Sequence, residues 1–354
     1  MPVIRISNIL PDGTVGGKFA YYPDQNKDSK YLLPDGAAVL AMSGATTGKV
    51  SILTNPDNDK FYQNQRVGYF NPNGSADYSF VSSVVRSKSF LDQLDSVLVT
   101  GAQPNISPKE VDSFSFGFPT SKVEQSKIGR FFEVLDEIIA LRKRKLELLR
   151  AHKVALLQKF IPMPGRTMPG LRFFGLTEEW EIQDLGEVAK IIMGQSPDSR
   201  NYTDDSDNYI LVQGNADMKD GFVVPRIYTT QITKLAQKGD LIISVRAPVG
   251  DIGKTHFDVV IGRGVAAIRG NEFLFQVLTK MKLIGFWDKV STGSTFESIN
   301  SSDLTGAPIS LPTLEEQVLL GAIFIAIDDL IAAEASKLRR FELVKNSLLQ
   351  QMFV

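Results

Sequence analysis

The sequence of 354 residues contains no cysteine and only two histidines, His152 and His256. Without cysteine there is no disulfide framework, thiolate zinc site or cysteine nucleophile, and two histidines so far apart do not suggest a metal cluster. No apolar run reaches the roughly 18 residues of a membrane-spanning helix, and residues 1–5 lack the character of a secretion signal. We therefore expect a metal-free cytoplasmic protein that does not associate with membranes.

The sequence has no excess of positive or negative residues, and its formal net charge is −1. Residues 121–161 carry a net charge of +5, whereas residues 162–313 carry −3. Nucleic-acid-binding domains usually have a basic surface, so bulk charge alone does not indicate DNA binding. The basic run 142–145 could contact phosphates or an acidic partner, although such runs are more often the solvated face of a helix.

Motifs of covalent chemistry are also missing. We find no GxSxG elbow, HExxH helix, Rossmann fingerprint or adenine-methyltransferase [ND]PP[YFW] motif. Residues 44–49 and 250–255 look like phosphate-binding loops, but the first is too short between its glycines and the second has Pro248 where the first glycine belongs. We interpret both as glycine turns between strands, and we expect no catalytic residue and no enzyme activity in this chain.

An internal repeat is the strongest positive feature. Residues 124–161 recur as residues 316–353 at a constant offset of 192, with many identical positions. The identical pairs include Glu124/Glu316, Gln125/Gln317, Gly129/Gly321, Phe132/Phe324, Asp136/Asp328, Ile139/Ile331, Lys145/Lys337 and Lys153/Lys345. A repeat of this kind indicates that the protein is built from two similar halves.

Between the repeats, short apolar runs alternate with turn residues. The runs 3–6, 37–42, 66–70 and 114–118 predict strands in the first half, and 240–245 and 259–261 predict strands in the second half, where 273–284 predicts a short helix. The chain is thus expected to contain a mostly β domain at 1–120, a long helix at 121–161, a second mostly β domain with an N-terminal linker at 162–313, and a second long helix at 314–354.

Each repeat has apolar residues at three- and four-residue intervals, which is typical of an amphipathic helix. A helix of about 41 residues would be about 60 Å long and would project from a small domain. Two such helices most economically bury their apolar stripes against each other as an antiparallel pair, although each could instead pack on its own β domain. The predicted interface consists of Leu135, Ile139, Leu146, Leu149, Ile327, Ile331, Leu338 and Phe341.

Several motifs together resemble one known family. They are Leu156-Leu157-Gln158-Lys159-Phe160, Pro169-Gly170-Leu171-Arg172-Phe173, Trp180-Glu181, Leu185-Gly186-Glu187-Val188, Gly194-Gln195-Ser196-Pro197, and the segments 239–251 and 311–317. In this combination the chain closely resembles the DNA specificity subunit of type I restriction-modification systems, over nearly its whole length.

The resemblance implies an α+β fold with an internal pseudo-twofold repeat. Two mostly β target-recognition domains would each read one half of a split sequence in double-stranded DNA, separated by two long helices that form an antiparallel coiled coil. It also implies a non-catalytic subunit without a cofactor of its own. Modification subunits would bind S-adenosylmethionine and methylate adenine, and restriction subunits could join them.

One departure from the family pattern concerns the first recognition domain. If Ile6-Ser7-Asn8 corresponds to Gln213-Gly214-Asn215, the first half has no counterpart of residues 180–197. The first domain is therefore expected to be incomplete at its N-terminus. A shorter gene, a cloned fragment, or a segment supplied in trans by another polypeptide or by self-association would each explain this.

Candidate base-reading residues follow from side-chain chemistry. Arg and Lys donors suit guanine, Gln and Asn suit adenine, and Ser and Thr suit bases or phosphates. In the first domain the candidates are Arg5, Asn8, Ser43, Thr46, Lys49, Gln65 and Gln103. In the second they are Gln195, Ser196, Gln213, Asn215, Arg246, Lys254, Arg263 and Ser294. Each of them could equally be a turn residue or a solvated side chain.

Two other functions remain open from the sequence. One is a scaffold that binds protein or sugar and not DNA, with two β domains on a coiled-coil spacer, which the acidic balance of 162–313 favours. The other is an enzyme that uses Lys49 or Lys254 on nucleotide phosphates, which the defective phosphate-loop motifs disfavour.

Overall fold

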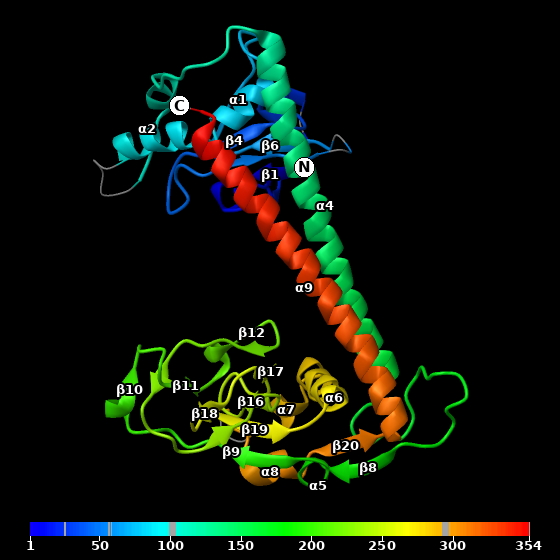
Figure 1. Ribbon diagram of the computed structural model, residues 1–354. Helices are drawn as coiled ribbons and strands as arrows, with labels where there is room; N and C mark the ends of the chain where they lie inside the picture. The colour runs from blue at the N-terminus through cyan, green and yellow to red at the C-terminus, as the bar shows by residue number, and fades with distance from the viewer. Residues whose placement is uncertain (25, 56, 58, 99–103, 292–296, 354) are drawn as a thin grey trace. The chain divides into compact units, whose positions relative to one another are not determined.

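The computed structural model describes residues 1–354 except 25, 56, 58, 99–103, 292–296 and 354 (Figure 1). The chain forms two compact units: unit 1 comprises Met1–Arg144 and Ala335–Val354, and unit 2 comprises Lys145–Glu334. The long helices α4 (Lys122–Phe160) and α9 (Leu314–Gln351) each contribute one part to each unit. Each unit is therefore described by itself.

Unit 1 contains two small sheets. The first has the strand order β2 (Ala20–Tyr21), β1 (Pro2–Ile4), β6 (Phe61–Gln63) and β3 (Leu32–Leu33), and the second has the order β5 (Val50–Ile52), β4 (Ala38–Ala41) and β7 (Val67–Tyr69). Strands β1, β4 and β7 confirm three of the strands predicted from the sequence. Strand β4 is buried throughout and contributes alternate residues to two apolar clusters, one on each face of its sheet.

Three short helices of unit 1 were not predicted: α1 (Tyr78–Val84), α2 (Lys88–Leu98) and α3 (Pro108–Asp112). Local capping signals explain two of them. The Asp77 carboxylate accepts hydrogen bonds from the N–H groups of Ser79 and Phe80 at the start of α1, and Ser107 caps α3. Two short 3-10 helices, at Ile6–Asn8 and Asn26–Tyr31, complete the unit.

The predicted strand at 114–118 is wrong, because these residues form no regular secondary structure. Their aromatic side chains contribute to the core instead. The ring centroids of Phe114 and Phe116 lie 5.5 and 6.1 Å from that of Phe90 in α2.

Unit 2 contains larger sheets. The first has the order β10 (Tyr202–Thr203), β14 (Tyr228–Thr229), β11 (Tyr209–Val212), β18 (Val259–Ile261) and β15 (Leu235–Ala236). The second has the order β12 (Met218–Lys219), β13 (Phe222–Val223), β17 (Ile252–Lys254), β16 (Leu241–Ser244), β19 (Val265–Arg269) and β9 (Lys190–Met193). Strands β20 (Pro308–Leu311) and β8 (Glu181–Asp184) form a separate pair. The strands predicted at 240–245 and 259–261 are confirmed as β16 and β18.

The helices of unit 2 pack on one face of its six-stranded sheet. They are α5 (Leu185–Val188), α6 (Glu272–Leu283), α7 (Phe286–Val290) and α8 (Ser301–Thr305), with 3-10 turns at Ser199–Asn201 and Asn215–Asp217. Helix α6 confirms the short helix predicted at 273–284. Trp180, Phe273 and Trp287 are fully buried in the resulting core, and the Trp180 and Phe273 rings meet edge to face.

In both units the parts of α4 and α9 run antiparallel, as predicted. In unit 1 the Asp136 Oδ1 lies 2.6 Å from Lys345 Nζ, and the Arg142 guanidinium lies 4.8 Å from the centre of the Phe341 ring. In unit 2 Lys145 Nζ lies 3.3 Å from Glu334. Residue numbers fall along α9 as they rise along α4, which defines the antiparallel direction.

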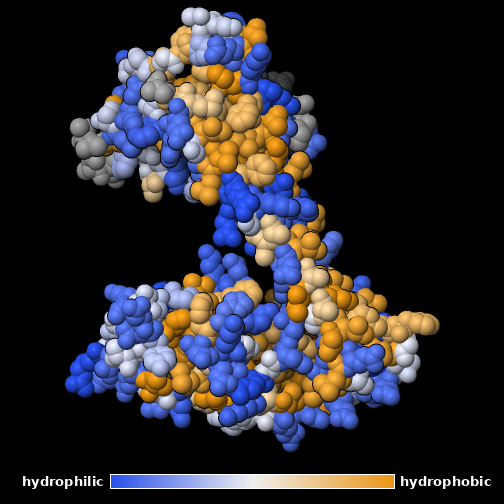
Figure 2. All heavy atoms as spheres, viewed as in Figure 1, coloured by the Kyte–Doolittle hydropathy of each residue, from blue (hydrophilic) through white to orange (hydrophobic). Residues whose placement is uncertain are grey.

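Of the predicted interface residues, Leu135, Ile139, Leu146 and Leu338 are buried, and Leu149, Ile327, Ile331 and Phe341 are partly buried. The assignment of these eight residues to the helix interface stays a prediction. In Figure 2 apolar residues gather on the face of unit 1 that is turned to the viewer, around the C-terminal part of α9. None of the described helices has an apolar stretch sufficient to cross a membrane.

The repeated glutamines have the same role in the two units. The Gln125 amide oxygen accepts a hydrogen bond from the backbone N–H of Asp77 at 2.8 Å, and the Gln317 amide oxygen accepts one from the Asn271 side chain at 2.8 Å. Asp77 caps α1 and Asn271 caps α6. Each repeat therefore joins its long helix to the capped N-terminus of a short helix in the adjoining domain.

Candidate nucleic-acid interface

Five of the eight base-reading candidates of the second domain line one pocket of unit 2. This pocket has a volume of about 200 Å³. Its lining consists of Ser196, Gln213, Gly214, Asn215, Arg246, Ala247, Arg263 and Gly264. The structure thus brings together predicted residues that are dispersed over nearly 70 positions of the sequence.

The pocket forms where loops at the ends of several strands meet. Backbone hydrogen bonds hold these loops together: Gly262 N donates to Val212 O at 2.8 Å, and Val245 N donates to Gly264 O at 2.8 Å. Arg263 N also donates to the Ser196 hydroxyl at 3.1 Å. Because the loops are tied to paired strands, their backbones bring these side chains to one pocket.

Glycine permits the close approach of these loops. A Cβ atom at Gly264 would lie 2.0 Å from Gln213 O, and one at Gly194 would lie 2.1 Å from Gly262 O. No side chain fits in such a space, since the opposing atoms belong to the backbone. Gly194 belongs to the motif 194–197 that carries the family resemblance, but the sequence did not predict this close approach for either glycine.

The arginines at the pocket differ from the other arginines nearby. Arg226 and Arg269 form ion pairs with the buried carboxylates of Asp217 and Asp240. Arg246 and Arg263 are exposed, and within the described residues neither guanidinium forms an ion pair. A free guanidinium can donate two parallel hydrogen bonds to guanine or contact phosphate.

Asp217 supports the loop that carries Gln213 and Gly214. Its carboxylate accepts hydrogen bonds from the N–H groups of Gln213 at 2.7 Å and Gly214 at 3.2 Å, and from Arg226 Nε at 2.8 Å. The buried carboxylate thus holds the loop backbone through three hydrogen bonds, and none of them uses the Gln213 side chain.

Unit 1 places three candidates at the matching positions. Asn64 N donates to Ile4 O as Gly262 N donates to Val212 O, and Met42 N donates to Arg66 O as Val245 N donates to Gly264 O. These bonds define equivalent strand ends in the two units. By this correspondence Ser43 matches Arg246, Gln65 matches Arg263, and Arg5 lies at the position of Gln213 and Gly214, directly before the 3-10 turn.

The proposed alignment of Ile6-Ser7-Asn8 with Gln213-Gly214-Asn215 needs correction. The 3-10 turn Ile6–Asn8 matches the 3-10 turn Asn215–Asp217, because in each the third residue accepts a hydrogen bond from the backbone N–H before the turn. Asn8 is therefore the counterpart of Asp217. It is 1% exposed and bonds to Arg5 N, Gly16 O and Lys18 O, so its position indicates a structural role and not base reading.

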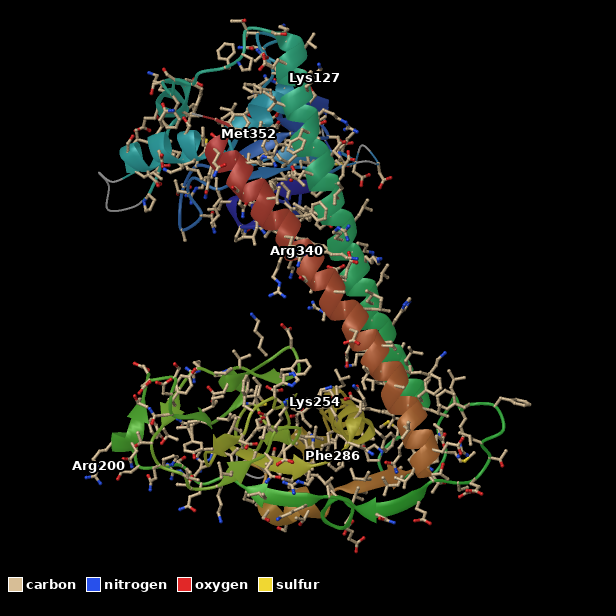
Figure 3. The ribbon with its side chains drawn as sticks, viewed as in Figure 1. Lys127, Arg200, Lys254, Phe286, Arg340 and Met352 are labelled. Atoms are coloured by element: carbon tan, nitrogen blue, oxygen red, sulfur yellow. The ribbon has the colours of Figure 1, made fainter. Side chains whose placement is uncertain are left out.

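The remaining candidates lie elsewhere or make other contacts. Lys254 forms an ion pair with Glu272 at 2.8 Å and lies 4.5 Å from the centre of the Phe275 ring, beside α6 (Figure 3). The Thr46 hydroxyl donates to Ile6 O at 3.3 Å. Gln195 is exposed and lies outside the pocket lining, and its backbone carbonyl accepts a hydrogen bond from the Thr233 hydroxyl. Lys49 precedes β5 and is partly buried. Gln103 and Ser294 lie outside the described residues.

The described residues contain no group of histidine, aspartate and glutamate side chains that could hold a metal ion. Arginine, glutamine and serine side chains at the ends of fixed strands are suited to hydrogen-bonded recognition of a polar, planar ligand such as a base edge.

Known proteins share this sequence and fold. The family model of the type I restriction modification DNA specificity domain matches residues 1–151 and 177–342. A putative type I restriction enzyme MjaX specificity subunit from Methanocaldococcus jannaschii is 31% identical over 237 residues, which are 64% of this chain and 55% of that protein. The match therefore spans about half the length of this relative.

Two solved structures have the same fold. A chain from a structure of type I R-M system assembly and conformational transition has a TM-score of 0.61 and 25% identity, with 98% of this chain and 90% of that chain covered. The S subunit of a type I restriction-modification system from M. genitalium has a TM-score of 0.63 and 14% identity, with 96% and 87% covered. The chain belongs to the type I restriction-modification DNA specificity family.

Proposed function

We propose that the chain is the sequence-specificity subunit of a type I restriction-modification complex and reads a bipartite target in double-stranded DNA. The observation that carries this proposal is the set of matching strand ends, with Gln213, Arg246 and Arg263 in unit 2 and Arg5 and Gln65 in unit 1. Ser43 lies at the third matching position of unit 1, but its hydroxyl oxygen is buried. Because the two sets differ in chemistry, each unit would read a different half-site.

The arginine and glutamine side chains of the two sets each suit a particular base. Arg246 and Arg263 suit guanine through two parallel hydrogen bonds, and Gln213 and Gln65 suit adenine in the same way. Few other unpaired basic residues lie at the pocket. Partner subunits would therefore supply much of the contact with the DNA phosphates.

The chain has no catalytic role in this proposal. Modification subunits bind S-adenosylmethionine and methylate adenine, while this chain selects the sequence and positions those subunits through the long helices. Restriction subunits join the same complex. The exposed basic residues of α4 and the exposed apolar residues Leu343 and Val344 of α9 offer surface for such subunits.

The proposal is tested by methylation with a modification subunit and S-adenosylmethionine on a random DNA library. Arg246→Ala and Arg263→Ala should each relax the base preference in one half-site and leave the other unchanged, because each lost bidentate contact is worth about 1–3 kcal/mol. Gln65→Ala should act on the opposite half-site.

Arg200→Ala is the matched control, because Arg200 is an exposed arginine of unit 2 that already pairs with Asp198 at 2.8 Å. It should leave both half-sites unchanged. An unaltered methylated sequence in all three test variants would contradict the proposed readout. A DNA affinity that does not depend on salt, alone and with the modification subunit, would favour the rival scaffold function.

A further inference from the structure

Arg226 is an exposed arginine of unit 2 that is tied to the loop carrying Gln213. It lies between β13 and β14, outside the lining of the pocket. Its Nε donates to Asp217 Oδ1 at 2.8 Å, and Asp217 Oδ2 accepts hydrogen bonds from Gln213 N at 2.7 Å and from Gly214 N at 3.2 Å. One carboxylate therefore connects the arginine to the main chain of the loop.

The two partners of this ion pair differ in exposure. Asp217 is 1% exposed, whereas the side chain of Arg226 is 54% exposed. A buried carboxylate is costly without a counter-charge, and Arg226 supplies it. The contact uses only Nε of the guanidinium. Within the described residues, Nη1 and Nη2 of Arg226 form no hydrogen bond and no ion pair.

Unit 1 holds the matching turn with a neutral side chain. Gly16 N donates to Asn8 O at 2.9 Å, as Val224 N donates to Asp217 O at 2.8 Å. The Asn8 side chain accepts a hydrogen bond from the main-chain N–H before the turn, and its Nδ2 donates to Lys18 O at 3.2 Å. An asparagine thus holds this turn through main-chain groups.

An ionised aspartate at the same place has no N–H group to donate. Asp217 instead pairs with the side chain of Arg226, which lies two residues after Val224. The turn itself does not require an arginine, since Asn8 holds the same turn by hydrogen bonds to main-chain groups. Unit 2 therefore carries an additional exposed guanidinium beside a residue that lines the pocket.

We propose that Arg226 binds a phosphate of the DNA backbone through Nη1 and Nη2 and is a positioning residue for Gln213. This inference rests on the proposed reading of DNA. The planar guanidinium presents its donors in a fork, so Nε can bind Asp217 while the terminal nitrogens bind phosphate oxygens. The phosphate contact adds affinity without sequence information, and the bond to Asp217 holds the main chain from which the Gln213 amide reads a base.

A phosphate suits this position better than a base edge. Arg226 lies outside the pocket, and Arg246 and Arg263 in its lining already supply donors for guanine. A guanidinium with one nitrogen fixed by a buried carboxylate loses little further side-chain freedom when it binds an anion. The ion pair with Asp217 therefore prepares the free side of Arg226 for a phosphate.

The first test measures base preference by methylation of a random duplex library with the full chain and a modification subunit. Arg226→Ala should lower the preference in the half-site of unit 2 about tenfold, at the position that Gln213→Ala also changes. On a Gln213→Ala chain, Arg226→Ala should have little further effect there, because both residues act through one base contact. The half-site of unit 1 is the internal reference and should not change.

The double variant Asp217→Asn with Arg226→Ala separates positioning from phosphate binding. It copies the neutral turn of unit 1 and removes the unpaired buried carboxylate that could unfold an Arg226→Ala chain. Its base preference should recover. Its salt dependence should not recover, because one phosphate contact is lost in both variants. The slope of the logarithm of DNA affinity against the logarithm of salt concentration should be smaller by about 0.9 in each.

Arg269→Ala is the matched control. The Arg269 side chain is 51% exposed, and its Nε lies 3.2 Å from the carboxylate of Asp240, whose side chain is 5% exposed. This pair lies at the end of β16 and β19 that is opposite to the pocket. Loss of this ion pair should change neither the base preference nor the salt slope.

Four results would overturn the proposal. A salt slope unchanged by Arg226→Ala would exclude the phosphate contact. A base preference that is not recovered in the double variant, or that Arg269→Ala lowers equally, would exclude the positioning role. A change at a position that Gln213→Ala leaves unaltered would show that Arg226 itself reads a base. If Arg246→Ala relaxes its half-site and Arg226→Ala does not, this inference alone is wrong, whereas no effect of either variant contradicts the proposed function as well.

Discussion

Lys153 Nζ lies 2.7 Å from Asp328 Oδ1, and this ion pair joins α4 to α9 in unit 2. The repeat offset carries both residues onto Lys345 and Asp136, which form the corresponding pair in unit 1 at 2.6 Å. Each aspartate also contacts its own domain: Asp136 binds Arg86 of unit 1, and Asp328 binds Gln276 of α6. The repeated aspartates therefore connect the helix pair to the domains by the same geometry.

The two aspartates should differ in their contribution to stability. Asp136→Asn leaves the cations of Arg86 and Lys345 without a counter-charge, and their side chains are only 8% and 14% exposed. Asp328→Asn leaves one cation, Lys153, beside a neutral glutamine. We expect losses of about 2–4 kcal/mol for Asp136→Asn and about 1–2 kcal/mol for Asp328→Asn.

Urea unfolding measured for both variants tests this order. Glu137→Gln is the control, because Glu137 is an exposed residue of the same helix and its ion pair with Arg130 should contribute little. Equal losses for the two aspartate variants would show that the second cation in unit 1 is not stabilised by Asp136.

The repeated glycines Gly129 and Gly321 differ in how closely a neighbouring helix approaches them. A Cβ atom at Gly129 would lie 2.5 Å from the backbone nitrogen of Phe80, whereas one at Gly321 would lie 3.2 Å from the Glu272 side chain. Gly129→Ala should destabilise unit 1 by about 1–3 kcal/mol, because the backbones of α4 and α1 cannot separate easily. Gly321→Ala should be close to neutral, since the better helix propensity of alanine, about 1 kcal/mol, offsets the tight contact.

Hydrogen exchange of the two units measures the effect of each glycine variant separately. Faster exchange throughout unit 1 in Gly129→Ala, with unit 2 unchanged, is the expected pattern. A Gly321→Ala chain that is less stable than Gly129→Ala would contradict this difference between the two helix contacts.

Tyr78 should make unit 1 sensitive to alkaline pH. Burial raises the pKa of Tyr78 to about 12, and its hydroxyl accepts a hydrogen bond from Ala38 N at 2.9 Å. The folded protein therefore retains the phenol proton where the unfolded chain, with a pKa near 10.0, loses it. The stability that this group contributes is complete below pH 10 and is lost as the pH rises from 10 to 12, by at most about 3 kcal/mol.

Urea unfolding of unit 1 across this pH range checks the slope. Tyr78→Phe removes the titrating group and should flatten the dependence, leaving the smaller contribution of Tyr69, whose pKa is raised by burial in the same direction. A slope unchanged by Tyr78→Phe would show that other groups control the alkaline transition.

The long helices should set the spacing between the two half-sites if each unit reads one of them. Each helix is continuous, and α4 passes from unit 1 to unit 2 after Arg144, while α9 passes from unit 2 to unit 1 after Glu334. Insertion of one heptad at both points adds about 10 Å of helix and should lengthen the spacer of the methylated sequence by about three base pairs, with both half-sites kept.

Insertion into α4 alone is the control, because it breaks the register with α9 and should abolish site-specific methylation without creating a longer spacer. Methylome sequencing that shows the original spacer after the double insertion would refute the role of the helices as a ruler.

The sequence by itself determined the features that depend on neighbouring residues. The periodic apolar positions and the constant offset predicted α4 and α9 and their antiparallel direction, since helix periodicity is local and the repeat demands similar halves. The buried strands β4, β16 and β18 were visible as short apolar runs. Helices α1 and α3 were not predicted, although Asp77 and Ser107 are typical N-cap residues. The composition of residues 1–120 is typical of strands, and this pattern determined the prediction.

Only the tertiary structure decided which polar residues form a site. Arg246, Arg263 and Gln213 meet because strands that are distant in sequence pair in one register, whereas Asn8 is buried by hydrogen bonds to Gly16 and Lys18. The segment 114–118 also shows that a local pattern is not sufficient. Its apolar pattern suits a strand, but a strand forms only where a partner strand supplies the hydrogen bonds. Side-chain chemistry is fixed by the sequence, but pairing between distant segments decides which side chains are exposed together.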